Sequence, residues 1–199
     1  MEIAFGEHGY TMKKLIVSVV LIIALVLGFY YYLSNIRDQG SSGDDVIRAS
    51  RVTEVLSRNM DARYPPTPKE VIRFFADITQ VLHNDDYSKQ DFEALGALLY
   101  RLYDDELLEI NPWEQYLKDL HDEVDSYRSR NYVISSFLVS SSTDVVYFQE
   151  DGLDYARLHC LFTMRSGVDL YSLDHQFLLR RGENGRWKIL GWQKVEVEQ

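Results

Sequence analysis

The sequence predicts an α+β protein with an N-terminal transmembrane helix followed by a cone-like domain of helices packed on a curved antiparallel sheet. Three observations predict it. Residues 15–33 are an uncharged apolar run, residues 46–127 repeat hydrophobic side chains with the helical period, and residues 132–197 repeat them with the strand period. Helices that precede a block of strands are typical of α+β proteins.

The apolar run at residues 15–33 (LIVSVVLIIALVLGFYYYL) is long enough to cross a bilayer as a helix. Lys13 and Lys14 precede it, and positive charge favours the cytoplasmic side, so we expect a single-pass cell-membrane protein with a cytoplasmic N-terminus and an extracytoplasmic domain. The alternative is a cleaved signal peptide. Against it, the run exceeds the usual apolar length of a signal peptide, and no small-residue cleavage site follows.

Four segments are expected along the chain. Residues 1–11 precede Met12-Lys13-Lys14, which resembles a natural start, and are interpreted as an upstream extension. The transmembrane anchor then covers residues 12–33. Residues 34–45 are polar and rich in glycine and serine, which is typical of a flexible linker. Residues 46–199 form the extracytoplasmic α+β domain.

The helical half is expected to hold four helices and one short helical piece. The first spans residues 46–59 and has the loosest periodicity. The second begins at Pro68, because Thr67 can cap it and Glu70 completes a Thr-x-x-Glu capping box. The others are expected at residues 89–103 after the cap Ser88, at 105–110, and from Pro112 onward with Asn111 as the cap. The last helix should turn one face to the core: Trp113, Leu117, Leu120, Val124 and Tyr127.

The strand half is expected to be an antiparallel meander. Its strands are predicted at residues 132–140, 144–149, 153–165, 169–181 and 186–197. The hairpin signals are Asp151-Gly152, Ser166-Gly167 and Asn184-Gly185.

A two-residue turn at Ser166-Gly167 sets the register of the sheet. It places Phe162 opposite Tyr171 and Leu158 opposite His175 on an apolar face, which is the arrangement that a buried face requires. The next loop pairs Leu179 with Ile189 and Phe177 with Gly191 on the same face.

The opposite face of the sheet combines polar and apolar side chains. His159 lies opposite Asp174 with Lys194 beyond, and a cross-strand ion pair is the favoured interpretation. The same face carries more apolar surface than a solvated sheet usually shows. Two explanations stay open: the first strand pair folds over it, or it binds a second copy in a homodimer or an envelope protein partner. The binding residues proposed for that interface are Tyr155, Leu178, Leu190 and Trp192.

Composition excludes several functions. The chain has a net charge of −10 at pH 7, which repels nucleic acid, so no nucleic-acid partner is expected. The single cysteine, Cys160, cannot form an internal disulfide and is expected to be a small buried residue.

No metal site and no cofactor are expected. His121-Asp122-Glu123 lacks a second histidine at helical spacing and is interpreted as a solvated polar face. Asn84-Asp85-Asp86 lacks the glycine of a calcium loop and is interpreted as a turn between helices. No glycine-rich phosphate loop or nucleophile elbow is present.

Two residues are candidates for catalysis. His175 is expected on the apolar face, where it could act as a general base with Tyr171 nearby as a donor, and Tyr147 or Tyr132 as further donors. The favoured interpretation is a core histidine whose ring is satisfied by a hydrogen bond.

The order of helices and sheet, together with the closing strand Gly185-Arg186-Trp187-Lys188-Ile189-Leu190-Gly191-Trp192, resembles the nuclear-transport-factor-two-like superfamily with its cystatin-like cone. More narrowly, the chain resembles a family of bacterial membrane-anchored proteins of unknown function. The segments that carry this likeness are YPPTPKEVIRFF (64–75), LYRLYDDELLEINP (99–112) and FLLRRGENGRWKILGWQ (177–193). The resemblance implies a fold and a location, and the superfamily includes both enzymes and binding modules.

These observations favour a non-catalytic binding or scaffolding module displayed outside the cell. The alternative is a small cone-fold enzyme, a hydrolase or an isomerase, that uses His175 in a pocket. A pocket in which His175 meets a carboxylate would favour the enzyme, and a filled cone would favour the module.

Overall fold

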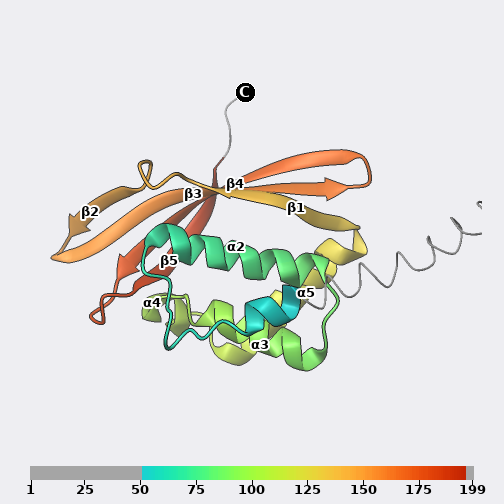
Figure 1. Ribbon diagram of the computed structural model, residues 1–199, viewed down its shortest axis with the longest axis horizontal. Coiled ribbons are helices and arrows are strands. Elements are labelled where there is room, and N and C mark those ends of the chain that lie inside the picture. The colour runs from blue at the N-terminus through green and yellow to red at the C-terminus, as the bar shows by residue number, and fades with distance from the viewer. Residues whose placement is uncertain (1–50, 196–199) are drawn as a thin grey trace, which may run out of the picture. The chain divides into compact units, whose positions relative to one another are not determined.

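The computed structural model describes residues 51–195. It shows a layer of helices covering one face of a five-stranded antiparallel sheet (Figure 1). The strand order is β1-β3-β4-β5, and β2 pairs with the free part of β3. The predicted α+β class, with helices first and an antiparallel sheet after them, is confirmed.

The fold prediction is wrong in its first part, the transmembrane helix. Within residues 51–195 no helix is long and apolar enough to cross a membrane. The helices that the structure describes are amphipathic, with one buried and one charged face, and their apolar faces are used against the sheet and against each other. The predicted transmembrane helix at 15–33 lies outside the described residues, as do the extension at 1–11 and the linker at 34–45.

The helices begin where the capping residues predict, with one exception. Residues 51–56 are helical, and helix α2 (Pro68–Asn84) is capped by Thr67, whose hydroxyl accepts from the Glu70 N–H at 3.3 Å. The capping box of Ser88 opens α3 (Lys89–Tyr100), and the short α4 (Asp105–Glu109) follows. Helix α5 (Trp113–Ser129) differs from the prediction, because Pro112 occupies the cap position and the Asn111 amide donates to the Leu107 carbonyl instead.

The strands lie close to their predicted ranges. They are β1 (Tyr132–Val139), β2 (Val146–Glu150), β3 (Leu153–Ser166), β4 (Asp169–Arg181) and β5 (Trp187–Val195). The Asp151-Gly152 turn is confirmed, and both of its residues have positive φ angles, 52° and 78°.

The predicted register between β3 and β4 is wrong by two residues. Ser166 pairs with Asp169, so the turn consists of Gly167 and Val168 rather than Ser166 and Gly167. The positive φ of Gly167, 62°, explains this, because a tight hairpin turn can require glycine at its first central position. A two-residue shift keeps every side chain on its face, so Leu158 meets Phe177 and Cys160 meets His175 within the buried layer.

A bulge in β5 corrects a second expectation. Leu179 pairs with Ile189 as predicted, but Phe177 pairs with Trp192 rather than Gly191, because Leu190 is an extra residue in the ladder. Beyond the bulge every side chain of β5 exchanges faces. Trp192 and Lys194 therefore lie on the helix-facing side of the sheet, opposite to the side that the sequence predicts.

Helix α2 lies along the concave face of the sheet and fills the centre of the core (Figure 1). Its inward side chains are completely buried, and so are the facing residues of β3, β4 and β5: Val71, Ile78 and Leu82 against Leu158, Leu179 and Ile189. Helix α5 contacts α2, α3 and the strand β1, and a cavity separates part of its inner face from the other strands.

Candidate functional site

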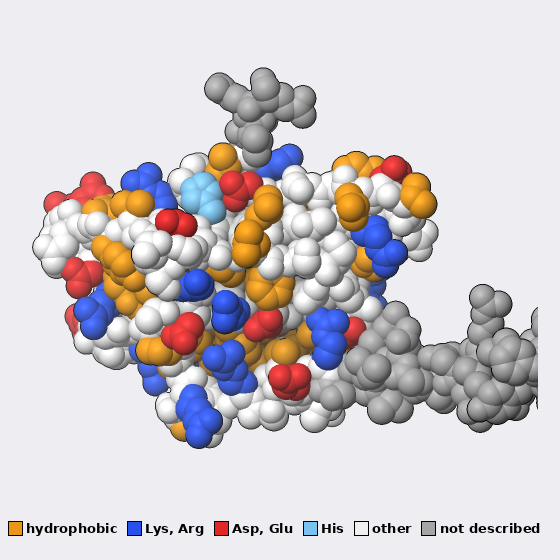
Figure 2. Space-filling model, turned by 45° about the horizontal axis from the view of Figure 1, so that its top comes forward, with side chains coloured by type: hydrophobic (Ala, Val, Ile, Leu, Met, Phe, Trp, Pro, Cys, Tyr) orange, Lys and Arg blue, Asp and Glu red, His pale blue; other side chains and the backbone are white. Residues whose placement is uncertain are grey.

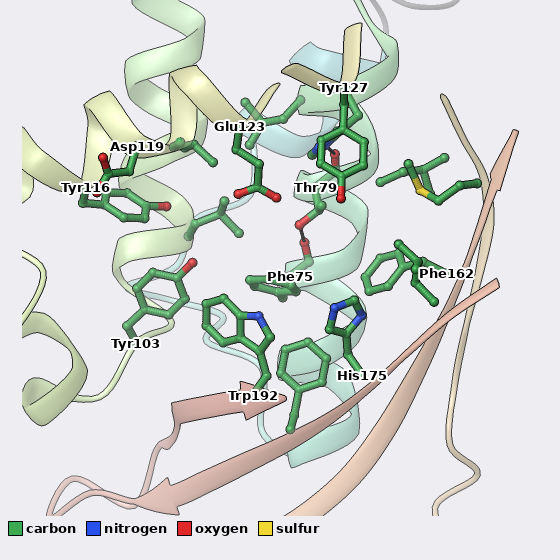
Figure 3. Close-up of a pocket in the computed structure, with 18 of the residues that line it drawn as sticks. Phe75, Thr79, Tyr103, Tyr116, Asp119, Glu123, Tyr127, Phe162, His175 and Trp192 are labelled. Atoms are coloured by element: carbon green, nitrogen blue, oxygen red, sulfur yellow. Dashed lines mark hydrogen bonds between the residues drawn. The ribbon is translucent and has the colours of Figure 1, made fainter. Parts of the chain in front are cut away.

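A cavity of about 280 Å³ lies between the helices and the concave face of the sheet. Helices α2 and α5 form its roof, β3, β4 and β5 form its floor, and the residues after α3 close one side (Figure 3). The cone predicted from the sequence is therefore hollow at this end. Cavities of this kind, mostly apolar with a few polar groups, are the usual form of small-molecule sites.

Aromatic rings form much of the cavity wall. Phe177 and Trp192 stack on the floor with ring centroids 5.9 Å apart, and Phe75 of α2 meets the Trp192 ring at 5.7 Å. Tyr103 adds a further contact to Trp192 at 5.8 Å. Trp192 nevertheless remains 44% exposed, so one large ring in the wall is still accessible.

Two carboxylates of α5 belong to the same cavity. Glu123 points into the space between the rings, and Asp119 lies one turn earlier beside Tyr116 (Figure 3). The Gln115 amide donates to Asp119 at 2.7 Å, whereas Glu123 makes no hydrogen bond or ion pair with any other described residue. Desolvation by the surrounding apolar walls raises the pKa of Glu123.

His175 lies on the floor of the cavity beside the Phe162 ring, with the centroids 5.8 Å apart. Its Nδ1 atom is buried and forms no hydrogen bond with the described part of the chain. Burial lowers the pKa of this imidazole, and Lys194 adds to the effect, although Asp174 opposes it. His175 is therefore neutral near pH 7, and its Nδ1 is a buried ring nitrogen without a hydrogen bond to residues 51–195.

The hydroxyl groups of Tyr103 and Tyr116 point toward one another at the side of the cavity (Figure 3). Tyr116 also donates to the Gly96 carbonyl at 3.5 Å. Burial raises the pKa of both phenols far above the usual value, so both stay protonated and available as hydrogen-bond donors.

The structure separates the two residues proposed for catalysis. His175 lines the cavity, but Tyr171 does not; its ring is 46% exposed and contacts Tyr132 instead. Tyr132 and Tyr147 also lie outside the cavity lining, the latter against Trp187. The groups that share the cavity with His175 are Glu123 and Tyr127 rather than the tyrosines expected from the sequence.

The outer face of the sheet holds three of the four residues proposed for an interface. Tyr155 stacks on Phe148 at 5.4 Å, and the half-buried Leu178 and Leu190 line a shallow hollow beside it. Trp192 also borders this hollow, but the β5 bulge turns it toward the helices, and it lines the cavity as well. Figure 2 shows that hydrophobic side chains on this side are separated by charged and other polar groups. The homodimer or partner interface stays a prediction.

His159 and Asp174 form an ion pair on that outer face, with Nδ1 3.1 Å from the carboxylate. The contact is diagonal, because His159 pairs with Gln176 in the corrected register, and the Gln176 amide lies 3.0 Å from its Nε2. Lys194 forms no ion pair with any of the residues that the structure describes, since the bulge moves it to the other face.

No group of three or more histidine, cysteine, aspartate or glutamate side chains in residues 51–195 could hold a metal ion. Cys160 is fully buried, and burial raises the pKa of its thiol to about 12, so it is unreactive at neutral pH.

Glu123 lines the cavity, which the sequence interpretation did not predict, although its side chain is exposed as that interpretation expected. It was grouped with His121 and Asp122 as a solvated polar face. The signal that could have found it is helical spacing, because Tyr116, Leu120, Glu123 and Tyr127 follow one another at intervals of four, three and four residues and share one face.

The whole chain can be compared with known protein families. No curated protein matches this sequence. A family model with the description Domain of unknown function (DUF6715) matches residues 6–192. Because this match covers nearly the whole chain, the protein belongs to the DUF6715 family.

Proposed function

We propose that the domain is a binding module that holds a small organic molecule in the cavity between α2, α5 and the sheet. The observation that supports this most strongly is the cavity itself, about 280 Å³ with walls of aromatic and aliphatic side chains. The cavity is open to solvent, since Trp192 in its wall is 44% exposed, and apolar surface left in contact with water adds nothing to stability. A domain that needed only a hydrophobic core would be more stable if side chains filled this cavity.

The finer relation to the nuclear-transport-factor-two-like superfamily is part of the same proposal. Its support is the arrangement of helices over one face of an antiparallel sheet (Figure 1), together with the cavity that lies between the two layers. Because one fold serves both enzymes and binding modules, this relation does not choose the activity.

The neutral fluorescent probe N-phenyl-1-naphthylamine tests the binding function. We expect the full-length chain to bind it with enhanced probe fluorescence, because the cavity removes the probe from water. The matched variant is Leu173→Trp, which fills the cavity from β4 with a larger ring and leaves residues 1–50 unchanged.

Probe that binds elsewhere on the chain contributes the same fluorescence to wild type and to Leu173→Trp. The cavity signal is therefore the difference between wild type and Leu173→Trp, measured by titration at equal protein concentration. Circular dichroism establishes that the variant is folded. Identical titration curves for the two folded proteins would rule out the binding function.

One observation favours a second candidate function, a small hydrolase or isomerase. His175, whose Nδ1 makes no hydrogen bond with the described residues, and the carboxyl group of Glu123 line the same cavity, so two groups that can exchange a proton share one site. The two functions differ in the fate of the bound molecule. Mass spectrometry after incubation recovers it unchanged from a binding module and converted from an enzyme.

A further inference from the structure

The charge of the cavity points to the class of molecule that it binds, an inference that rests on the binding function proposed above. Two carboxylates, Asp119 and Glu123, line the cavity, and among the described residues that line it there is no lysine or arginine. The remaining polar groups of the wall are hydroxyls, an amide and two histidines: Thr79, Tyr103, Tyr116, Tyr127, Asn111, His83 and His175. The wall is therefore acidic.

Glu123 lies at the open rim of the cavity, where its side chain is exposed to solvent. It points into the cavity (Figure 3) and makes no ion pair with the residues in 51–195. A cation bound in the cavity beside this carboxylate would gain a charge-assisted contact with it.

The aromatic wall favours the same sign of charge. The faces of tryptophan, tyrosine and phenylalanine rings are negative, and they attract a cation held within about 6 Å of the ring centre. Phe75, Tyr103 and Trp192 lie around one part of the cavity, with neighbouring ring centroids between 5.7 and 6.5 Å apart. These rings pack against one another and form the part of the cavity wall below Glu123 (Figure 3).

The two histidines of the wall do not oppose a cation. Desolvation lowers the pKa of both His83 and His175, so both imidazoles are neutral near pH 7. His83 is further occupied by the Thr79 carbonyl, 2.8 Å from its Nδ1.

We propose that the cavity binds an organic cation, an amine or quaternary ammonium group on a small apolar body, with the charged nitrogen beside Glu123 and the body against the rings of Phe75, Phe177 and Trp192. A metal cation fits less well, because calcium and magnesium require six or more oxygen ligands and the cavity wall is mostly carbon.

Two molecules of the same shape test this proposal. Benzyltrimethylammonium carries a positive nitrogen where neopentylbenzene has a neutral carbon. Each is used to displace N-phenyl-1-naphthylamine from the full-length chain, and only the fluorescence that Leu173→Trp abolishes is counted. We expect the cation to displace the probe at a concentration at least about tenfold lower than its neutral counterpart.

The Glu123→Gln variant removes the charge and keeps the size of the side chain. We expect it to weaken displacement by benzyltrimethylammonium about tenfold or more, so that the preference over neopentylbenzene is largely lost. The matched control is Asp122→Asn, which removes the same charge from the neighbouring position of α5. Asp122 lies outside the cavity lining, where it pairs with Lys118 at 3.7 Å, so this variant keeps the preference.

The outcomes separate the two proposals. If the probe does not bind in the cavity, the binding function itself fails. If probe and neopentylbenzene bind but the cation has no advantage in the wild type, only the inference of a cationic ligand is overturned. An advantage that persists in Glu123→Gln also overturns it.

Discussion

Replacement of Asp104 by alanine is expected to lower the free energy of unfolding by about 3–5 kcal/mol, the usual cost of breaking a buried ion pair. Asp104 is only 5% exposed and holds the Arg180 guanidinium through both carboxylate oxygens, with one N–H at 3.1 Å. It also accepts from the Glu106 N–H at 3.1 Å and so caps α4. Its loss would leave a half-buried arginine on β4 without its main partner.

A second carboxylate that binds Arg180 serves as the control. Glu106 also binds Arg180, at 3.1 Å, but its side chain is 68% exposed, and exposed ion pairs contribute little. Urea denaturation of the full-length chain should therefore place Glu106→Ala within about 1 kcal/mol of wild type. A loss of similar size in both variants would contradict the importance given to the buried contact.

Phe177→Ala is the second change with a large expected effect. The Phe177 ring is 1% exposed and is in contact with Phe75 at 5.3 Å and with Trp192 at 5.9 Å. Truncating it removes buried apolar surface and enlarges the existing cavity, so the free energy of unfolding should fall by about 3–5 kcal/mol. Urea denaturation measures this loss.

Leu178 is the matched position, because it follows Phe177 in β4 and points to the outer face, where it is only half-buried. We expect Leu178→Ala to cost about 1 kcal/mol. If Leu178→Ala were the more damaging variant, the assignment of the two faces of β4 would be wrong.

Local signals predicted the elements well because each depends on a few neighbouring residues. Thr67 and Ser88 satisfy N–H groups at the starts of α2 and α3, whatever the rest of the chain does. The alternation of apolar residues likewise identified all five strands. The boundary of α5 was less certain from sequence, since both Asn111 and Pro112 are suitable near a helix start, and the Asn111 amide is used by Leu107.

The register between two strands, and the face of the sheet on which a side chain lies, depend on details that the alternation of apolar residues does not determine. A shift of two residues at Gly167 leaves every side chain of β4 on its face, so the hydrophobic pattern fits the correct and the incorrect pairing equally well. The bulge at Leu190 changes the face of every later residue in β5, and Gly191 beside it was the only sequence sign. That single extra residue places Trp192 in the cavity.

The candidate site was predicted only in part. His175 was expected on the apolar side of the sheet, and it lines the cavity. The position of Glu123 at the cavity was not predicted, because its side chain is exposed like those of His121 and Asp122, and a charged residue on an acidic helix face gives no local sign of bordering a cavity. The cavity arises because α5 packs partly on α2 and α3, which is a tertiary feature that no single segment encodes.

The central claim, that an organic molecule binds between the helices and the sheet, is tested most directly by methyl NMR of the full-length chain labelled at its four methionines. Met164 lines the cavity, whereas Met60 is 1% exposed elsewhere in the core and serves as an internal control. Saturating N-phenyl-1-naphthylamine is predicted to shift the Met164 methyl signal through its ring current and to leave the Met60 signal in place. A Met164 signal that does not move, or equal shifts at both methionines, would contradict the claim.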